Sequence, residues 1–253
     1  MKKSFAFILA ALLMLSMFAG CGTTDSGETT TEATTQATEP AGLTAAFVGD
    51  SITFGVGTQT EEELYWRRLE KTLEFSEVTG LGIKGSCVSA ASTMGMQSGP
   101  LAKRVDQFPD VDVLFIFLGT NDYGCDTPMG TMADSMDLSF YGAWNYSLNY
   151  LKENRPNTQI ILMTPAQRVE TETSNTNKQK LKLADYAEAI RQVGKAHNLP
   201  VIDLYTETED KFTLLTFQQY MPDKLHLNGA GHEAIAQIIE KWWAENESTL
   251  FAK

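Results

Sequence analysis

Residues 111–118 constrain the fold more than any other segment. They read Val-Asp-Val-Leu-Phe-Ile-Phe-Leu, so apolar side chains fall on both faces of an extended chain. A strand that is buried on both faces is typical of the centre of a parallel sheet, because helices cover both sides of such sheets. We therefore expect further strands beside this one and helices above and below it.

The segments on either side of this strand alternate between strand and helix patterns. The strands are predicted at residues 45–48, 78–83, 159–164 and 200–204. The helices are predicted at residues 61–75, 142–154, 177–197 and 229–245. Strands that alternate with helices imply an α/β fold with a parallel sheet covered on both sides.

Residues 1–20 have the form of a secretory signal, with Lys2 and Lys3 before a short apolar run and small residues at its end. The apolar run is too short to span a bilayer comfortably. The sequence Phe18-Ala19-Gly20-Cys21 resembles the lipobox of bacterial lipoproteins, in which the cysteine is lipidated. We therefore expect Cys21 to carry the lipid; the alternative is an ordinary cleaved signal with an incidental cysteine.

Residues 21–42 are rich in Thr and Glu and contain no aromatic side chain. Such a composition cannot bury a core, and its acidic residues extend the chain, so we expect a disordered tether. The length of residues 43–253 suits one folded domain. The expected location is the extracellular face of the bacterial cell membrane, with the domain held there by its lipid.

The formal net charge of the chain is −12, and removal of the signal takes away two more positive charges. An acidic surface argues against nucleic acid as a partner and against electrostatic binding to anionic lipid. Membrane contact is therefore expected only through the N-terminal lipid, and the partner is expected to be neutral or cationic. Cys87 and Cys125 lack the spacing of a zinc site, so no metal is expected.

Polar residues follow the predicted strands. They are Ser51, the pair Gly85-Ser86, the segment Gly119-Thr120-Asn121-Asp122 and, near the end of the chain, Asp223 and His226. The carboxyl ends of parallel strands lie on one edge of a sheet, so these residues are expected to meet in one crevice. Each has a structural explanation by itself, such as a helix cap at Asp50 or Ser51 or a turn at Asn121.

Together these residues form a set that could hydrolyse an ester. The Ser51 hydroxyl needs a base to take its proton, and His226 is a suitable one. Asp223 lies three residues before His226, close enough to orient its ring. The backbone N–H groups of Ser51 and Gly85 and the amide of Asn121 could bind a tetrahedral oxyanion.

Four segments resemble the four conserved blocks of the SGNH hydrolases, also called GDSL esterases/lipases. They are Gly49-Asp50-Ser51-Ile52, Gly85, Gly119-Thr120-Asn121-Asp122 and Asp223-x-x-His226. The resemblance implies a flavodoxin-like, three-layer α/β/α sandwich without a cofactor. It also implies a Ser51–His226–Asp223 triad and an oxyanion hole of Ser51, Gly85 and Asn121. Gly85 is the loosest match, because Gly82 lies nearby, and Leu227 stands where the family usually has proline.

Other residues are interpreted as structural. Asp50 and Asp122 are expected to hold loops by hydrogen bonds, His197 to complement a helix dipole and His232 to brace the loop of His226. The tryptophans Trp144, Trp242 and Trp243 are expected to pack. Tyr123 follows the Asn121 block, and the sequence leaves open whether it lines the pocket or packs.

The first functional hypothesis is an extracytoplasmic carbohydrate acetyl esterase that acts on a small-molecule or glycan ester. A lysophospholipase or acyl-thioesterase is the second, although no apolar lid segment is evident in the sequence. The third is a glycan-binding lipoprotein that has lost catalysis. The sequence leaves open the natural ester, the oligomeric state and a disulfide between Cys87 and Cys125, which the neighbouring oxyanion loops would bring close.

Overall fold

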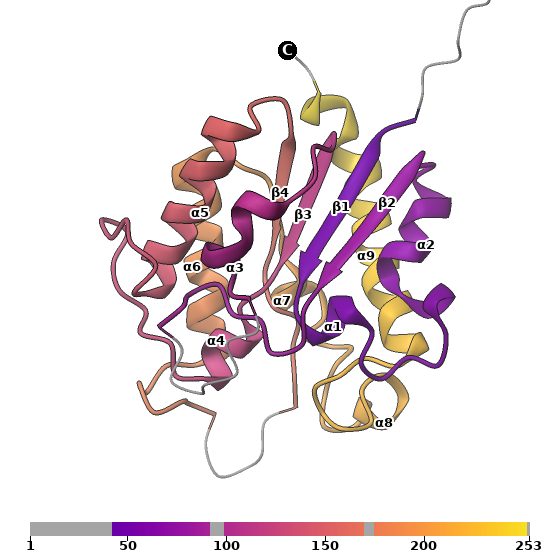
Figure 1. Ribbon diagram of the computed structural model, residues 1–253. Coiled ribbons are helices and arrows are strands. Elements are labelled where there is room, and N and C mark those ends of the chain that lie inside the picture. Colours follow the sequence, from indigo (N-terminus) through magenta and orange to yellow (C-terminus); the bar gives the residue numbers. More distant parts are fainter. Residues whose placement is uncertain (1–41, 92–98, 170–174, 252–253) are drawn as a thin grey trace, which may run out of the picture. The chain divides into compact units, whose positions relative to one another are not determined.

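The computed structural model describes residues 42–91, 99–169 and 175–251 (Figure 1). The predicted signal, the lipidation site at Cys21 and all but the last residue of the predicted tether lie outside these residues. Among the helices of the described ranges, none is both long enough and apolar enough to cross a membrane.

Five parallel strands form one sheet in the order β2-β1-β3-β4-β5. The strands are β1 (Thr44–Gly49), β2 (Glu77–Gly82), β3 (Val113–Phe117), β4 (Gln159–Met163) and β5 (Val201–Ile202). β3 is central, and all five of its residues are buried. The expected three-layer α/β/α fold is therefore confirmed, with the apolar segment at its centre.

Helices cover both faces of the sheet (Figure 1). α2 (Tyr65–Thr72) and α9 (Gly229–Leu250) pack on one face, whereas α3 (Leu101–Arg104), α5 (Phe140–Asn154) and α6 (Leu183–His197) pack on the other. The alternation of side chains along β1 and β3 divides the core in two. Phe47 and Phe115 stack on the α2–α9 side, with ring centroids 4.6 Å apart, and their strand neighbours point to the other side.

Short helical segments follow several strands at the carboxyl edge of the sheet. They are α1 (Ser51–Phe54), α4 (Thr120–Gly124), α7 (Leu204–Glu207) and α8 (Phe217–Tyr220), and two 3-10 turns lie at Glu61–Glu63 and Val105–Gln107. The strands align so that Gly49 of β1 pairs with Gly82 of β2 and with Phe117 of β3. The loops that follow these three strands therefore begin at the same level.

Several predicted boundaries differ from the structure. The helix predicted at 177–197 begins only at Leu183, because the Asn177 side chain accepts the N–H groups of Gln179 and Leu181 and so forms a turn. The strand predicted at 200–204 has two residues, because Asp203 caps α7. The helix predicted at 61–75 is divided at Leu64, and the final helix runs to Leu250.

Candidate active site

Ser51 is the first residue of α1, and only Asp50 separates it from the end of β1. Asp50 caps this helix, since its carboxylate accepts the Ile52 N–H at 2.9 Å. The cap that the sequence assigned to either Asp50 or Ser51 is thus made by Asp50, and the Ser51 hydroxyl is left for another partner. Burial raises the pKa of Asp50 to about 6, although the Ile52 N–H opposes the shift. Ser51 itself is 7% exposed.

A chain of hydrogen bonds joins Ser51 to the loop before α9. The Ser51 hydroxyl oxygen lies 2.9 Å from Nε2 of His226, and Nδ1 of His226 lies 2.7 Å from Oδ2 of Asp223. The other carboxylate oxygen accepts the backbone N–H groups of Leu225 and His226. Burial raises the pKa of Asp223, but the bonds from His226 and Leu225 outweigh it, and the net pKa lies below the usual range. The geometry lets a base take the serine proton while a carboxylate holds its ring.

Asn121 connects the loops that follow β2 and β3. It lies in α4, and its Nδ2 donates to the Ser86 carbonyl at 3.0 Å. Gly85 adopts a φ of 73° in a turn that the Ser86 N–H closes onto the Ile83 carbonyl, a conformation that favours glycine. The structure therefore brings the Gly85–Ser86 loop to Asn121.

Gly82, the alternative to Gly85, has a different environment. It lies inside β2, and a Cβ added there would be 2.2 Å from the Phe54 nitrogen, so close packing against α1 explains this glycine. Among the described residues, no acceptor binds the backbone N–H of Ser51 or of Gly85. Both groups are available to a negatively charged oxygen.

Asp122 makes a second connection between the same two loops. Its side chain is fully buried and accepts the N–H groups of Val88 at 2.8 Å and Ser89 at 3.2 Å. Burial raises its pKa to about 7, while the two N–H donors act in the opposite direction. The loop-holding roles predicted for Asp50 and Asp122 are thus confirmed.

Arg104 lies beneath the same loops and was not singled out by the sequence. It is 6% exposed; Nη1 donates to the Leu81 carbonyl at 2.7 Å, and Nη2 to the Gly49 carbonyl at 3.0 Å and to the Ser86 hydroxyl at 3.3 Å. Burial lowers its pKa to about 10, although the nearby Asp50 acts in the opposite direction. One feature of the sequence could have indicated that Arg104 is buried. It lies three residues after the apolar Leu101, and residues three apart share a helix face.

Residues 47–234 match the family described as GDSL-like lipase/acylhydrolase. The chain belongs to this family. The match spans the three hydrogen-bonded residues, from Ser51 to His226, and it confirms the resemblance that the sequence blocks suggested. A GDSL-like protein is a hydrolase of the SGNH type, so the chain is an enzyme of this class.

No curated protein matches this GDSL-like chain. Solved structures of other proteins are similar to it in fold. A protein from Lactobacillus plantarum is 27% identical, with a TM-score of 0.68, covering 82% of this chain and 99% of its own. A mutant of an acetyl-xylooligosaccharide esterase from a Geobacillus species is 21% identical, with a TM-score of 0.58, covering 79% and 94%. An acetyl xylan esterase is also 21% identical, with a TM-score of 0.53, covering 80% and 99%.

The structure bears on two residues around the GDSL-like site, Tyr123, whose role the sequence left open, and His232. Tyr123 is buried in the core and packs edge-on against Tyr186, which agrees with the packing alternative. His232 does not brace the His226 loop; its Nδ1 accepts the Tyr65 N–H at 3.2 Å and so joins α9 to α2. Its ring also stacks on that of Tyr65, with centroids 5.9 Å apart.

Other expectations concern residues outside the hydrogen-bonded chain. The three tryptophans pack in or against the core, as expected. His197 lies in the last turn of α6 with Nε2 2.8 Å from Asn145 Oδ1, but burial lowers its pKa, which disfavours the charged ring that the helix dipole would stabilise. No disulfide joins Cys87 and Cys125 in the structure, a point that the sequence left open. Within the ranges that the structure describes, no group of three or more His, Cys, Asp or Glu side chains could hold a metal ion.

Proposed function

We propose that this protein is an extracytoplasmic serine esterase in which Ser51 is the nucleophile, His226 the general base and Asp223 the residue that orients it. The observation that carries the proposal is the pair of short contacts from Ser51 to His226 and from His226 to Asp223. Ser51 Oγ bonds to the acyl carbon while its proton passes to His226 Nε2. The alcohol then leaves with that proton. A water molecule next attacks the acyl carbon while His226 Nε2 takes its proton, and the acid leaves as that proton returns to Ser51 Oγ.

The oxyanion of the tetrahedral intermediate would bind to the N–H groups of Ser51 and Gly85 and to the Asn121 amide. Two observations support this proposal: neither backbone N–H has another acceptor among the described residues, and Asn121 is held to the Gly85–Ser86 loop. Asn121 donates through the same nitrogen to Ser86, and since no other described residue accepts from it, the second hydrogen of that amide stays available. Donors fixed before the reaction stabilise the developing charge at little cost in reorganisation.

The substrate we propose is a short acyl ester, foremost an acetyl group on a carbohydrate. The acidic chain and its expected extracellular location favour a neutral glycan over an anionic lipid. Two solved structures of similar fold carry the names of an acetyl-xylooligosaccharide esterase and an acetyl xylan esterase, which supports this choice. The chain itself would be attached to the outer face of the membrane through a lipid on Cys21.

A lysophospholipase or acyl-thioesterase is the second candidate, and one observation favours it. Leu214 and Leu215, in the loop before α8, are 55% and 95% exposed. This loop lies eight residues before Asp223, and exposed leucines could contact an acyl chain or a lipid surface.

A panel of substrates tests these proposals. p-Nitrophenyl acetate, butyrate and octanoate would be compared with acetylated xylan, peptidoglycan and lysophospholipid, and the Ser51→Ala protein serves as the blank. We expect kcat/KM to fall from acetate to octanoate and acetate to be released from acetylated xylan. A higher kcat/KM on octanoate or lysophospholipid would favour the second candidate, and no turnover of any ester would favour a binding protein.

A further inference from the structure

Ser51 and His226 belong to two segments that meet only in the folded protein. Ser51 begins α1, a helix of four residues, and His226 lies shortly before α9. A helix of one turn is not stable by itself, so neighbouring elements must hold it in place. The first residues of α2 contact both α1 and α9, and they are therefore placed to keep the hydroxyl group and the imidazole together.

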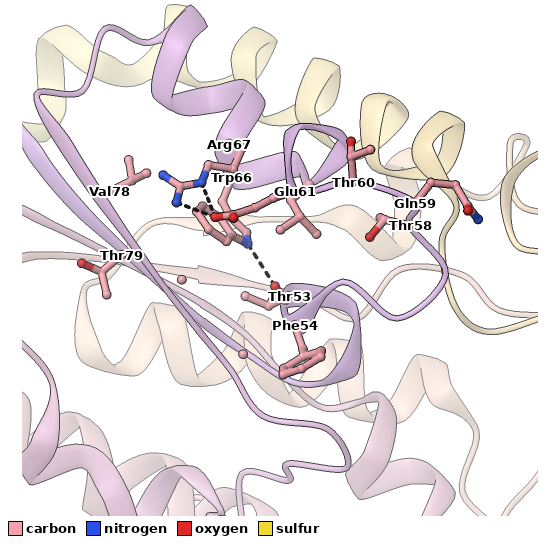
Figure 2. A pocket seen from close by; sticks show the side chains of 13 residues that line it. Thr53, Phe54, Thr58, Gln59, Thr60, Glu61, Trp66, Arg67, Val78 and Thr79 are labelled. Carbon is pink, nitrogen blue, oxygen red and sulfur yellow. Dashed lines mark hydrogen bonds and ion pairs between the residues drawn. The ribbon is translucent and has the colours of Figure 1, made fainter. Parts of the chain in front are cut away.

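Thr53 connects α1 to α2 through both its side chain and its backbone. Its hydroxyl oxygen lies 2.9 Å from the hydroxyl oxygen of Tyr65, and its carbonyl accepts the Nε1–H of Trp66 at 3.0 Å (Figure 2). Burial raises the pKa of Tyr65, although the bond with Thr53 acts in the opposite direction, so the phenol stays neutral. Two consecutive residues of α2 therefore hold the residue two positions after Ser51.

Tyr65 also connects α2 to α9. Its backbone N–H donates to Nδ1 of His232 at 3.2 Å, and the two rings stack at an angle of 7°. His232 is fully buried and lies near the start of α9, the helix that follows His226. Tyr65 thus contacts the helix of the nucleophile through its hydroxyl group and the helix after the base through its backbone and ring.

The ring of Tyr65 has a fixed position in the core. It is fully buried and meets Phe47 of β1 and Phe117 of β3 edge-on, with centroids 5.8 and 6.0 Å away. Close packing of this kind leaves little room for a ring to shift. The hydroxyl group therefore meets Thr53 from a point that is set by the sheet and not by α1 itself.

A direct contact between the two segments does not replace this connection. Gly57, in the turn after α1, has a φ of 102°, and an added Cβ would lie 2.6 Å from the carbonyl oxygen of Leu227, the residue after His226. Such a steric contact prevents the segments from moving closer but does not prevent them from moving apart. The hydrogen bonds from Tyr65 and Trp66 to Thr53 oppose that separation.

We propose that Tyr65 is a positioning residue for the esterase reaction, which holds α1 relative to α9 so that the Ser51 hydroxyl stays within hydrogen-bond distance of His226 Nε2. The proposal rests on the proposed esterase function and adds the residue that sets the geometry of its nucleophile. Tyr65 is buried and does not touch the substrate. Its loss should therefore lower kcat and leave KM almost unchanged.

A purely structural role is the alternative, since a buried hydrogen bond also contributes to stability. In that case removal of the Tyr65 hydroxyl would lower the melting temperature, and the folded variant would keep the kcat of the wild type. A misplacement of reacting groups by about 1 Å can lower the rate by about a hundredfold, so the loss of one restraint on Ser51 should be measurable in kcat.

Three variants remove or keep the bond between Tyr65 and Thr53. Tyr65→Phe removes the hydroxyl group but keeps the stacked ring and the N–H bond to His232. Thr53→Val removes the partner hydroxyl with little change in shape, and Thr53→Ser keeps it. The matched control is Ser147→Ala, which removes a fully buried hydroxyl group of α5 on the other face of the sheet.

Kinetics on p-nitrophenyl acetate are measured at a temperature at which every variant is folded. We expect Tyr65→Phe and Thr53→Val each to lower kcat by about tenfold with little change in KM. The double variant should be no slower than either single variant, because both changes remove the same bond. Thr53→Ser should recover most of kcat, and Ser147→Ala should keep it.

The reaction of Ser51 with phenylmethylsulfonyl fluoride is the second readout, since Ser51 Oγ displaces fluoride from sulfur while His226 takes its proton. We expect Tyr65→Phe to lower the rate constant of this reaction in step with kcat. Unchanged kcat and rate constant in folded Tyr65→Phe, or an equal fall in Ser147→Ala, would overturn the positioning role and leave the esterase standing. A wild-type protein that neither hydrolyses p-nitrophenyl acetate nor reacts at Ser51 would overturn both.

Discussion

The hydroxyl oxygen of Ser51 lies 2.9 Å from Nε2 of His226, although 175 positions separate the two residues in the chain. Ser51 begins the helix after the second strand of the sheet order, and His226 lies just before the last helix. Asn228 caps that helix through the Gly231 N–H, and its own N–H donates to the Tyr220 carbonyl. The position of His226 therefore depends on how α9 docks on the sheet.

Ser51→Ala is expected to abolish esterase activity while the fold is kept. The change removes one hydroxyl group that contacts His226, and no core side chain is altered. Loss of a triad member typically lowers kcat by several powers of ten. The measurement is kcat on p-nitrophenyl acetate, with circular dichroism as the control for folding. Activity retained by the pure, folded variant would remove Ser51 from the role of nucleophile.

Asn121→Ala is expected to lower kcat by roughly a hundred- to a thousand-fold, the usual effect of one lost oxyanion donor. KM should change less, because the negative charge develops only in the transition state. The variant also loses the bond to the Ser86 carbonyl, so its melting temperature is measured beside its kinetics. A rise in KM with kcat unchanged would show that Asn121 binds the substrate in its ground state.

The sequence predicted this site because each of its residues follows an apolar strand or precedes a strongly patterned helix. Ser51 and Asn121 could be placed on one edge of the sheet once β1 and β3 were recognised. Short-range turn chemistry was harder to predict. The helix expected from residue 177 starts at Leu183, since a single side chain, Asn177, holds the preceding residues in a turn.

Contacts between distant segments left no pattern in the sequence. Arg104 looks like an ordinary basic residue, and its three acceptors come from Gly49, Leu81 and Ser86, which only the folded sheet brings together. The position of the Trp66 ring over Gly80 likewise follows only from the folded arrangement of α2 on β2. Both features depend on tertiary packing, which periodicity does not encode.

Arg104→Met is expected to lower both kcat and stability, because it removes the guanidinium donors from the Leu81 and Gly49 carbonyls and from the Ser86 hydroxyl. The Gly49 carbonyl keeps the Ile83 N–H, so the Leu81 carbonyl loses most. An unsatisfied buried polar group costs about 1–3 kcal/mol in free energy of unfolding. The Gly49 carbonyl begins the turn to Ser51, and Ser86 follows Gly85, so the oxyanion donors should also lose their alignment. We expect a larger loss in kcat than in KM.

Arg104→Lys is the matched variant, since it keeps the positive charge and at least one donor. If Arg104 positions the oxyanion loops, kcat of Arg104→Lys should be at least tenfold higher than kcat of Arg104→Met. Both are measured at a temperature at which both variants are folded. Equal kcat in the wild type and both variants would limit Arg104 to a structural role.

The contribution of His232 to the stability of the domain is expected to fall in mild acid. This side chain is buried, and burial, with a smaller contribution from the charge of Arg68, lowers its pKa to about 3. The unfolded chain binds a proton at this histidine below a pH of about 6.5, and the folded protein does not. The contribution of His232 to the free energy of unfolding is therefore complete above that pH and is lost as the pH falls towards 3.

The variant His232→Gln tests this prediction, since its side-chain carbonyl can still accept the Tyr65 N–H. Chemical denaturation of both proteins at pH 7.5 and 5.0 gives two changes in the free energy of unfolding. Asp50 and Asp122, whose pKa values burial raises, act in the opposite direction, but they are present in both proteins and cancel in the comparison. We expect the wild type to lose about 2 kcal/mol more than the variant between these pH values. The same loss in both proteins would mean that His232 is protonated equally in the folded and the unfolded state.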